Sequence, residues 1–416
     1  MLSPFTESVF RRHLFLCTIA VFFFFVFNPQ GLSFDYGSGS GRYEDRVDSF
    51  SEYIVRNTIK RNILKKDDSS LAPIITKGYQ EDNYEYSPDD YKTYVSNLAI
   101  QTIPATIIAK MAKLDTEEKL DHFFILLRLA NALLLSIFIV GIFLCFCSLQ
   151  KVNLACLIPL LAGCSSGLIY FSQNLYFSSF LIVLPAFLIS MQLRHHQEFN
   201  KTLVFIFGIL YFLRGFEFST IFALLTAFSA ALFAQGNLSD KLKMAALAFA
   251  LILLAFASAL LLHILFLSLN NGSSPGDIIQ TFYENVQRRT QSIKGVPFPF
   301  SANFIEAMAG RWRLPAFSVF ANSFSLSQID VIVAMLFGLL MRTGRATDNE
   351  KIIYFYGFFG YASWYIFAYQ HIMWHNMYDW YIFALTMGLS FGLLVILYGS
   401  LTVEHFQRLR SIRQRQ

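Results

Sequence analysis

Hydrophobic residues form long runs along this 416-residue chain, and short polar stretches separate them. A helix needs about 20 apolar residues to cross a bilayer, because each residue adds about 1.5 Å of rise. Runs of near this length lie at 13–27, 123–149, 152–171, 176–192, 244–269, 328–341, 352–369 and 380–400. The pattern predicts a transmembrane helix over each of them.

One further stretch, 202–234, is interrupted by Arg214-Gly215-Phe216-Glu217. As a single helix it would measure about 50 Å, which is too long for one straight crossing. Each charge near the middle of the bilayer would also cost about 2.5–3.5 kcal/mol. We therefore predict two spans that meet at Arg214–Glu217, which brings the total to about ten and defines an all-α polytopic membrane protein.

The first run follows Arg11-Arg12, which is also typical of a signal peptide. It ends in Asn28-Pro29-Gln30-Gly31 without a small-x-small cleavage site. We therefore expect a retained signal anchor.

Basic residues in the loops predict the orientation, because cytoplasmic loops carry an excess of Lys and Arg. With a cytoplasmic N-terminus, the basic residues of the short connections and of the C-terminal tail all fall inside. The short outer connections at 172–175 and 370–379 contain no Lys or Arg. We expect both termini in the cytoplasm.

Composition supports a membrane protein and excludes a soluble enzyme. The chain is 55% hydrophobic, 17% aromatic and only 15% charged, whereas soluble domains carry about 25% charged residues. The net charge of +5 is explained by the cytoplasmic loops and tail, so it does not indicate a nucleic-acid partner. All five cysteines lie within predicted spans, and they imply no disulfide framework.

Two predicted outer loops, 28–122 and 270–327, extend the single membrane domain 1–416. Loops of this length are uncommon unless they are functional. The first has helix-compatible pieces at 46–64 and 89–113. The second of these pieces has one apolar side, formed by Leu98, Ile100, Ile103, Ile107, Ile108 and Met111. It predicts an amphipathic helix that lies either on the outer membrane surface or against the lobe itself.

Four carboxylates follow closely after the first span, and they are Asp35, Glu44, Asp45 and Asp48. A carboxylate near the membrane boundary can act as a general base on a hydroxyl group within hydrogen-bond reach. The alternative is an ordinary solvated acidic loop.

The Arg214–Glu217 interruption is a second candidate site, because ionisable residues within spans are expensive and commonly functional. Arg214 can bind a phosphate in fork geometry, Glu217 can hold Arg214 in place, and Gly215 allows a close turn. The alternative is a structural ion pair between two helices.

A third candidate lies at 370–380. On a helix, His371, His375 and Asp379 share one face. This spacing suits a metal, or a phosphate or sugar, although the zinc pattern HExxH is absent. Tyr378 and its aromatic neighbours are also typical of an interfacial belt.

The loop 284–315 adds basic residues on the outer side, and these are Arg288, Arg289, Lys294, Arg311 and Arg313. They can attract an anionic lipid head group or a diphosphate. The alternative is a solvated basic face.

The chain resembles the GT-C superfamily of polytopic glycosyltransferases, with a first span followed at once by a long acidic outer loop. Short segments look like pieces of uncharacterised bacterial members, and they are Asp48-Ser49, residues 94–101, Arg214–Phe218 and His371-x-x-x-His375-Asn376. The resemblance implies inverting transfer of a sugar from a polyprenyl-phosphate-linked donor to a glycan, lipid or protein acceptor. It implies a site that faces outward from a bacterial inner membrane, in cell-envelope polysaccharide synthesis.

The resemblance also implies roles for residues. A carboxylate of the first outer loop would be the base, with Asp48 favoured over Asp45, Glu44 and Asp35. The donor and acceptor would be bound by Arg214, Glu217, His371, His375, Asn376, Tyr378 and Asp379. No cofactor is implied with certainty, and a divalent cation stays open. The alternative function is a carrier or polymerase-type protein that binds a lipid-linked glycan without this chemistry.

Overall fold

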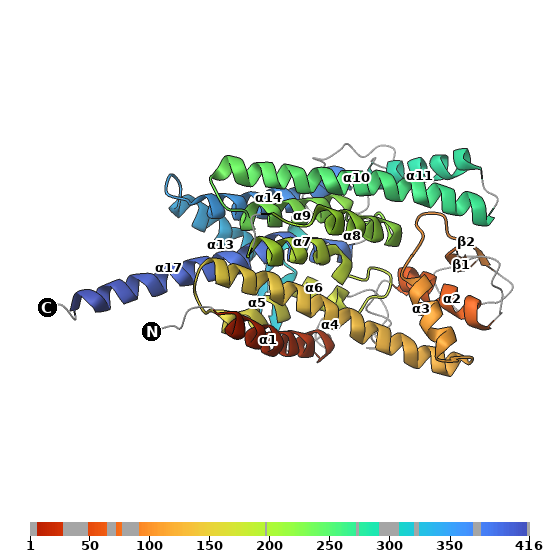
Figure 1. The fold of residues 1–416 in the computed structure, drawn as a ribbon, viewed down its shortest axis with the longest axis horizontal. Helices are drawn as coiled ribbons and strands as arrows, with labels where there is room; N and C mark the ends of the chain where they lie inside the picture. The colour runs from red at the N-terminus through yellow and green to blue at the C-terminus, as the bar shows by residue number, and fades with distance from the viewer. Residues whose placement is uncertain are drawn as a thin grey trace.

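The computed structural model describes residues 6–27, 49–64, 72–76, 91–195, 198–271, 274–290, 308–319, 324–368 and 376–413. Most helices run along the long axis of an elongated bundle (Figure 1). A small lobe containing α2 and α3 lies at one end, and both termini lie at the other. The two ends are called here the lobe end and the terminal end.

Four helices of the described chain are long and apolar enough to cross a membrane, namely Glu7–Phe27, Glu117–Leu149, Leu238–Asn270 and Tyr378–Gln407. They belong to α1 (Glu7–Phe27), α4 (Glu117–Leu149), α10 (Leu238–Asn271) and the α16–η4–α17 run (Asn376–Phe383, Ala384–Gly388, Leu389–Arg413). Other helices of the bundle are α7 (Phe180–Leu193), α8 (Lys201–Arg214), α9 (Ser219–Phe233), α13 (Gln328–Met341) and α14 (Asp348–Phe367). The chain is thus an integral membrane protein by helix length and composition, and the count of ten spans stays a prediction.

The predicted interruption of 202–234 is confirmed. Helix α8 ends at Arg214 and α9 begins at Ser219, and both Arg214 and Glu217 are buried where the two helices meet. The five residues 214–218 are called here the α8–α9 break.

The predicted single helix over 152–171 is wrong. This stretch forms three short helices, η3 (Ala155–Leu157), α5 (Ile158–Gly163) and α6 (Ser166–Ser172). Strand β3 (Pro315–Val319) lies against the gap between α5 and α6, where the Ser318 amide donates to the Cys164 carbonyl at 2.8 Å. A broken helix inside a membrane protein is tolerated because another backbone segment supplies the missing hydrogen bonds.

Strands also correct the all-α prediction. Strand β3 pairs antiparallel with β4 (Phe324–Ser327), and β1 (Ile74–Thr76) pairs antiparallel with β2 (Tyr91–Thr93). These two small sheets both fall within the predicted outer loops. The bundle itself remains helical.

In the first loop, α2 (Ser49–Leu64) matches the predicted piece 46–64, but the predicted helix over 89–113 is half wrong. Its first part forms β2 and a turn, and only α3 (Thr102–Met111) is helical. The Asn97 side chain accepts from the Ala99 amide at 3.0 Å, and Ala99 has a positive φ of 43°. This local turn competes with helix formation, as short polar side chains commonly do.

Helix α3 turns its small side chains inward. Ala105 and Ala109 are buried, whereas Ile107, Ile108 and Met111 are 52%, 50% and 79% exposed. The large apolar side chains therefore do not pack on the lobe, and their exposure favours the membrane-surface position over the alternative.

Helix α4 begins at Glu117, before the predicted start at residue 123. Its first turns are polar and form ion pairs with α2 of the lobe. Lys60 of α2 bonds to Glu117 at 2.9 Å, and Arg56 bonds to Asp121 at 3.0 Å. The lobe is thereby fixed to the end of a long bundle helix.

Candidate functional site

A cavity of about 360 Å³ opens beside the α8–α9 break. Four parts of the chain line it: Ser96 from the first outer loop, residues 216–220, three residues of α11 (Pro275–Thr290), and the end of α14. Phe256 of α10 completes the wall. This cavity is called here the outer cavity, and residues from both predicted outer loops contribute to it.

Segment 94–101 of the first loop is docked directly on the break. The Ile100 amide donates to the Leu213 carbonyl at 3.3 Å, and the Gln101 side chain donates to the Tyr176 carbonyl at 2.9 Å. Asn285 of α11 donates to the Ser96 hydroxyl at 3.2 Å. These bonds hold the two loops together at the mouth of the outer cavity.

Arg214 is 1% exposed at the last residue of α8. Its guanidinium lies over the Tyr211 ring, 4.7 Å from the centroid. Within the described chain no carboxylate lies within 4.0 Å of it, and its Nε and Nη1 have no hydrogen-bond acceptor. The expected Arg214–Glu217 ion pair is therefore not found among the described residues.

Glu217 is held by a different partner. The Tyr176 hydroxyl donates to Glu217 Oε1 at 2.9 Å, and the Asn97 side chain donates to the Tyr176 hydroxyl at 2.5 Å. The backbone carbonyl of Glu217 accepts from the Tyr211 hydroxyl. Glu217 also lines the outer cavity, so the Asn97–Tyr176 chain fixes a carboxylate at its wall.

Gly215 makes this position of Glu217 possible. A Cβ at Gly215 would lie 2.2 Å from Glu217 Oε2 and 3.3 Å from the Asn97 side-chain nitrogen. The φ of Gly215 is 173°, which is extended backbone open to any residue. Glycine here leaves the space that the Glu217 carboxylate occupies, and no unusual dihedral angle is involved.

Phe218 ends the break in a left-handed conformation, with φ of 58°. Its ring lies 5.2 Å from Tyr378, 5.2 Å from Tyr381 and 5.1 Å from Trp364, measured between centroids. A left-handed non-glycine residue costs about 1–3 kcal/mol and persists only where its surroundings hold it. The three rings provide those surroundings, and they bring Tyr378 of α16 next to the break.

Tyr378 and Asp379 are both buried, at 3% and 0% exposure. Asp379 accepts hydrogen bonds from Tyr361, at 3.0 Å, and from Tyr365, both of α14. Its carboxylate therefore ties α16 to α14 in this structure. Arg311, which we expected in a basic outer loop, is also buried.

Several predicted site residues lie outside the described part of the chain. They are the four acidic candidates Asp35, Glu44, Asp45 and Asp48, the two histidines His371 and His375, and the side chain of Asn376. The described neighbour of the acidic candidates is α2, which begins at Ser49. Its Glu52 is buried, pairs with Arg128, and accepts from the Leu175 amide at 3.4 Å. The first turn of α2 thus contacts the residue that precedes Tyr176.

Among the described residues, no group of three His, Cys, Asp or Glu side chains is placed to hold a metal ion.

Sequence reasoning missed Tyr176 and His263 as parts of this site. The His263 Nε2 lies 3.1 Å from the Val95 carbonyl, and its ring lies 5.8 Å from Phe216. His263 thus braces the segment that carries Asn97. The available signal was a lone histidine inside the apolar run 244–269.

No protein-family model and no curated protein sequence matches the chain. A solved structure with a similar arrangement is the archaeal oligosaccharyltransferase AglB from Archaeoglobus fulgidus, in complex with an inhibitory peptide and a dolichol-phosphate. The identity is 13% and the TM-score is 0.46, and the match covers 98% of this chain and 52% of AglB. The chain thus spans about half the length of that protein.

Proposed function

We propose that this protein is a membrane glycosyltransferase that moves a sugar from a polyprenyl-phosphate-linked donor to an acceptor outside the cytoplasm. The proposal rests on Arg214, a buried guanidinium in the α8–α9 break, whose residues 216–218 line the outer cavity. The lobe end is then the outer face, and the two termini are cytoplasmic.

The energetics of Arg214 support an anionic ligand. Burying a charge costs several kcal/mol. Stacking on Tyr211 returns up to about 2 kcal/mol, and a position at a helix C-terminus returns at most about 2 kcal/mol. Neither interaction supplies a hydrogen-bond acceptor to Nε and Nη1, which have none in the described chain. A phosphate would supply two oxygens in the fork geometry that guanidinium groups match.

The outer cavity supports a sugar beside that phosphate. Aromatic side chains form much of its wall, and its polar groups include Ser96, Glu217, Ser219 and Asn285. Ligand sites commonly combine an apolar wall with a few placed polar groups. Glu217 is therefore proposed to accept a hydrogen bond from a sugar hydroxyl, in place of the orienting role expected for it.

The proposed reaction is a single displacement with inversion. A carboxylate of the first outer loop, Asp48 foremost, removes the proton of the acceptor hydroxyl. The acceptor oxygen bonds to the anomeric carbon, and the bond from that carbon to the phosphate oxygen breaks. The lipid phosphate departs with the electron pair and is stabilised by Arg214, with His371 and His375 as further donors. A divalent cation stays an open addition.

The proposed contact between Arg214 and the donor's lipid phosphate can be tested by a binding measurement. We expect purified full-length protein to bind polyprenyl phosphate in native mass spectrometry, and Arg214→Met to weaken binding about 10- to 150-fold. This range corresponds to a charge-assisted interaction of about 1.5–3 kcal/mol. The matched control is Arg345→Met, because Arg345 is an exposed arginine in the turn between α13 and α14. Equal binding by Arg214→Met and wild type would refute the proposed clamp.

The base is tested separately by transfer to acceptor in membranes. We expect Asp48→Asn to lose transfer while it keeps polyprenyl phosphate binding. Full transfer by Asp48→Asn, Asp45→Asn, Glu44→Gln and Asp35→Asn would reject a first-loop base and leave the Arg214 clamp standing.

A further inference from the structure

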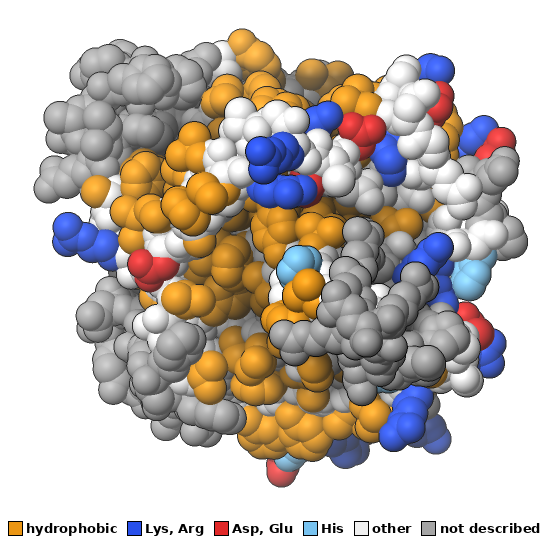
Figure 2. Space-filling model, turned by 90° about the vertical axis from the view of Figure 1, so that its left-hand side faces the viewer, with side chains coloured by type: hydrophobic (Ala, Val, Ile, Leu, Met, Phe, Trp, Pro, Cys, Tyr) orange, Lys and Arg blue, Asp and Glu red, His pale blue; other side chains and the backbone are white. Residues whose placement is uncertain are grey.

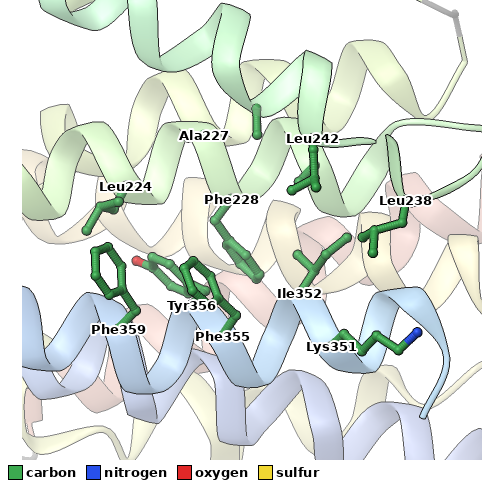
Figure 3. A pocket seen from close by; sticks show the side chains of 12 residues that line it. Leu224, Ala227, Phe228, Leu238, Leu242, Lys351, Ile352, Phe355, Tyr356 and Phe359 are labelled. Carbon is green, nitrogen blue, oxygen red and sulfur yellow. The ribbon is translucent and has the colours of Figure 1, made fainter. Parts of the chain in front are cut away.

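A second cavity, of about 370 Å³, lies between α9, α10 and α14 (Figure 3). Its wall comes from Leu224–Ala231 of α9, Leu238–Ala245 of α10 and Lys351–Phe359 of α14. It lies at the terminal end of the bundle, away from the outer cavity. We call it the inner groove.

The inner groove opens sideways from the bundle. Its rim residues Leu242, Phe355 and Phe359 are 54%, 65% and 41% exposed, and α10 is long and apolar enough to cross a membrane. The opening therefore faces the hydrocarbon of the bilayer.

Water is a poor occupant of this groove. A buried water needs two to four polar partners, and the side chains on the wall carry only a tyrosine hydroxyl and an amine. The Tyr356 hydroxyl already donates to the Leu385 carbonyl at 2.8 Å, and its ring stacks on Phe228 with centroids 4.1 Å apart. The rest of the surface is hydrocarbon, which suits an apolar chain.

The groove has one polar end, marked by Lys351 at the start of α14 (Figure 3). The turns at this end, 234–243 and 342–351, carry five Lys or Arg residues and three Asp or Glu residues, a net charge of +2. Figure 2 views this end of the molecule, where Lys and Arg side chains surround a largely hydrophobic surface.

The lysines at this end differ in whether they are free to bind a phosphate head group. Lys241 is buried and donates to the Ala234 carbonyl at 2.6 Å, so it caps α9. Lys351 and Lys243 are 55% and 75% exposed. Among the described residues, each pairs only with a carboxylate three residues away on its own helix, Asp348 and Asp240 respectively. Exposed pairs of this kind contribute about 0–1 kcal/mol, so a phosphate can replace the carboxylate at small cost.

We propose that the inner groove binds one acyl chain of an anionic phospholipid of the cytoplasmic leaflet, with the head group at Lys351 and Lys243. The apolar wall accounts for the chain, and the net positive charge at one end accounts for the sign of the head group. This is a lipid site separate from the proposed donor site, which lies at the other end of the bundle.

The test uses full-length protein in nanodiscs and counts retained lipids by native mass spectrometry, with phosphatidylglycerol and phosphatidylcholine as the two probes. Ala227→Phe places a ring into the groove, and we expect it to reduce retained phosphatidylglycerol at least tenfold. The control is Leu261→Trp, which adds a ring at a site on α10 that is 63% exposed and outside the groove. Lys351→Gln leaves the groove open, and we expect the preference for phosphatidylglycerol over phosphatidylcholine to fall about fivefold.

Three results would overturn the proposal. One is equal phosphatidylglycerol retention by Ala227→Phe and Leu261→Trp. Another is an unchanged preference for phosphatidylglycerol over phosphatidylcholine in Lys351→Gln. This measurement still tests the proposal if Ala227→Phe fails to fold. The third is loss of polyprenyl phosphate binding in Ala227→Phe with phosphatidylglycerol retained, because the groove would then hold the donor's tail. If Arg214→Met loses polyprenyl phosphate but keeps phosphatidylglycerol, both sites stand independently.

Discussion

Gly215 provides a sharp test of the site, because one added methyl group should displace a carboxylate without removing any polar group. In Gly215→Ala, the new Cβ would lie 2.2 Å from Glu217 Oε2. Ordinary contact needs about 3.4 Å, so the carboxylate must move by more than 1 Å. The Tyr176–Glu217 hydrogen bond, now 2.9 Å, would then exceed hydrogen-bond length.

The expected cost follows from two opposing terms. Losing a hydrogen bond to a charged group costs about 1.5–3 kcal/mol. Replacing glycine by alanine in an extended conformation returns about 0.4–1 kcal/mol, because the unfolded chain loses freedom. The net destabilisation is about 1–2 kcal/mol, which corresponds to a melting temperature lower by a few degrees.

Thermal unfolding of the full-length protein in detergent measures this effect. The matched control is Gly310→Ala, because a Cβ at Gly310 would meet no atom of the described residues within 4 Å. We expect this control to melt slightly above the wild type, because an unstrained alanine returns about 0.4–1 kcal/mol. The same substitution in a Glu217→Ala background tests the cause, since only the Asn97 contact at 3.3 Å then remains.

Two results would contradict the reasoning. Gly215→Ala could melt like Gly310→Ala, in which case the close approach does not exist. Alternatively, its penalty could persist in full without the Glu217 side chain, in which case the carboxylate is not what the methyl group displaces.

Three further predictions concern the surroundings of the site. Glu52→Gln removes the carboxylate that pairs with part-buried Arg128, so we expect about 1.5–3 kcal/mol of destabilisation, with partial recovery in the Glu52→Gln/Arg128→Met double variant; no recovery would count against the pair. A tryptophan at Met111 of α3 should be quenched by brominated lipids, whereas one at exposed Glu118 should not; equal quenching would argue against α3 lying on the membrane. Asp379→Ala removes the carboxylate that accepts from Tyr361 and Tyr365, so we expect about 2 kcal/mol of destabilisation, and an unchanged melting temperature would remove the proposed tie between α16 and α14.

The α8–α9 break could be predicted from the sequence, because the cost of placing Arg214 and Glu217 in hydrocarbon is a local property of the chain. The interruption between α5 and α6 could not. The run 152–171 contains no charged residue that would signal a break. The backbone group that bonds to the Cys164 carbonyl comes from Ser318 of β3, about 150 residues away in the sequence.

The role of Glu217 was mispredicted for the same reason. Adjacency in the sequence suggested Arg214 as its partner, but Arg214 ends a helix and points to Tyr211. The partner that holds Glu217 is Tyr176, from the connection before α7. Spacing within one segment cannot reveal such contacts. Within α3, Ile107, Ile108 and Met111 are exposed on one side, which follows from local spacing. Leu98 and Ile100 of the same predicted side lie before the helix, after a strand that depends on pairing with β1.

The central claim is tested most directly by transfer in proteoliposomes. The donor pool is polyprenyl-phosphate-linked sugar extracted from the source membranes, with the sugar labelled, and the readout is label on the acceptor together with free polyprenyl phosphate. We expect the wild type and Leu261→Trp to transfer, and Arg214→Met to be slower by about 10²–10³-fold, as for other groups that stabilise developing negative charge. Undiminished transfer by Arg214→Met, or no consumption of the donor by folded wild-type protein, would contradict the account.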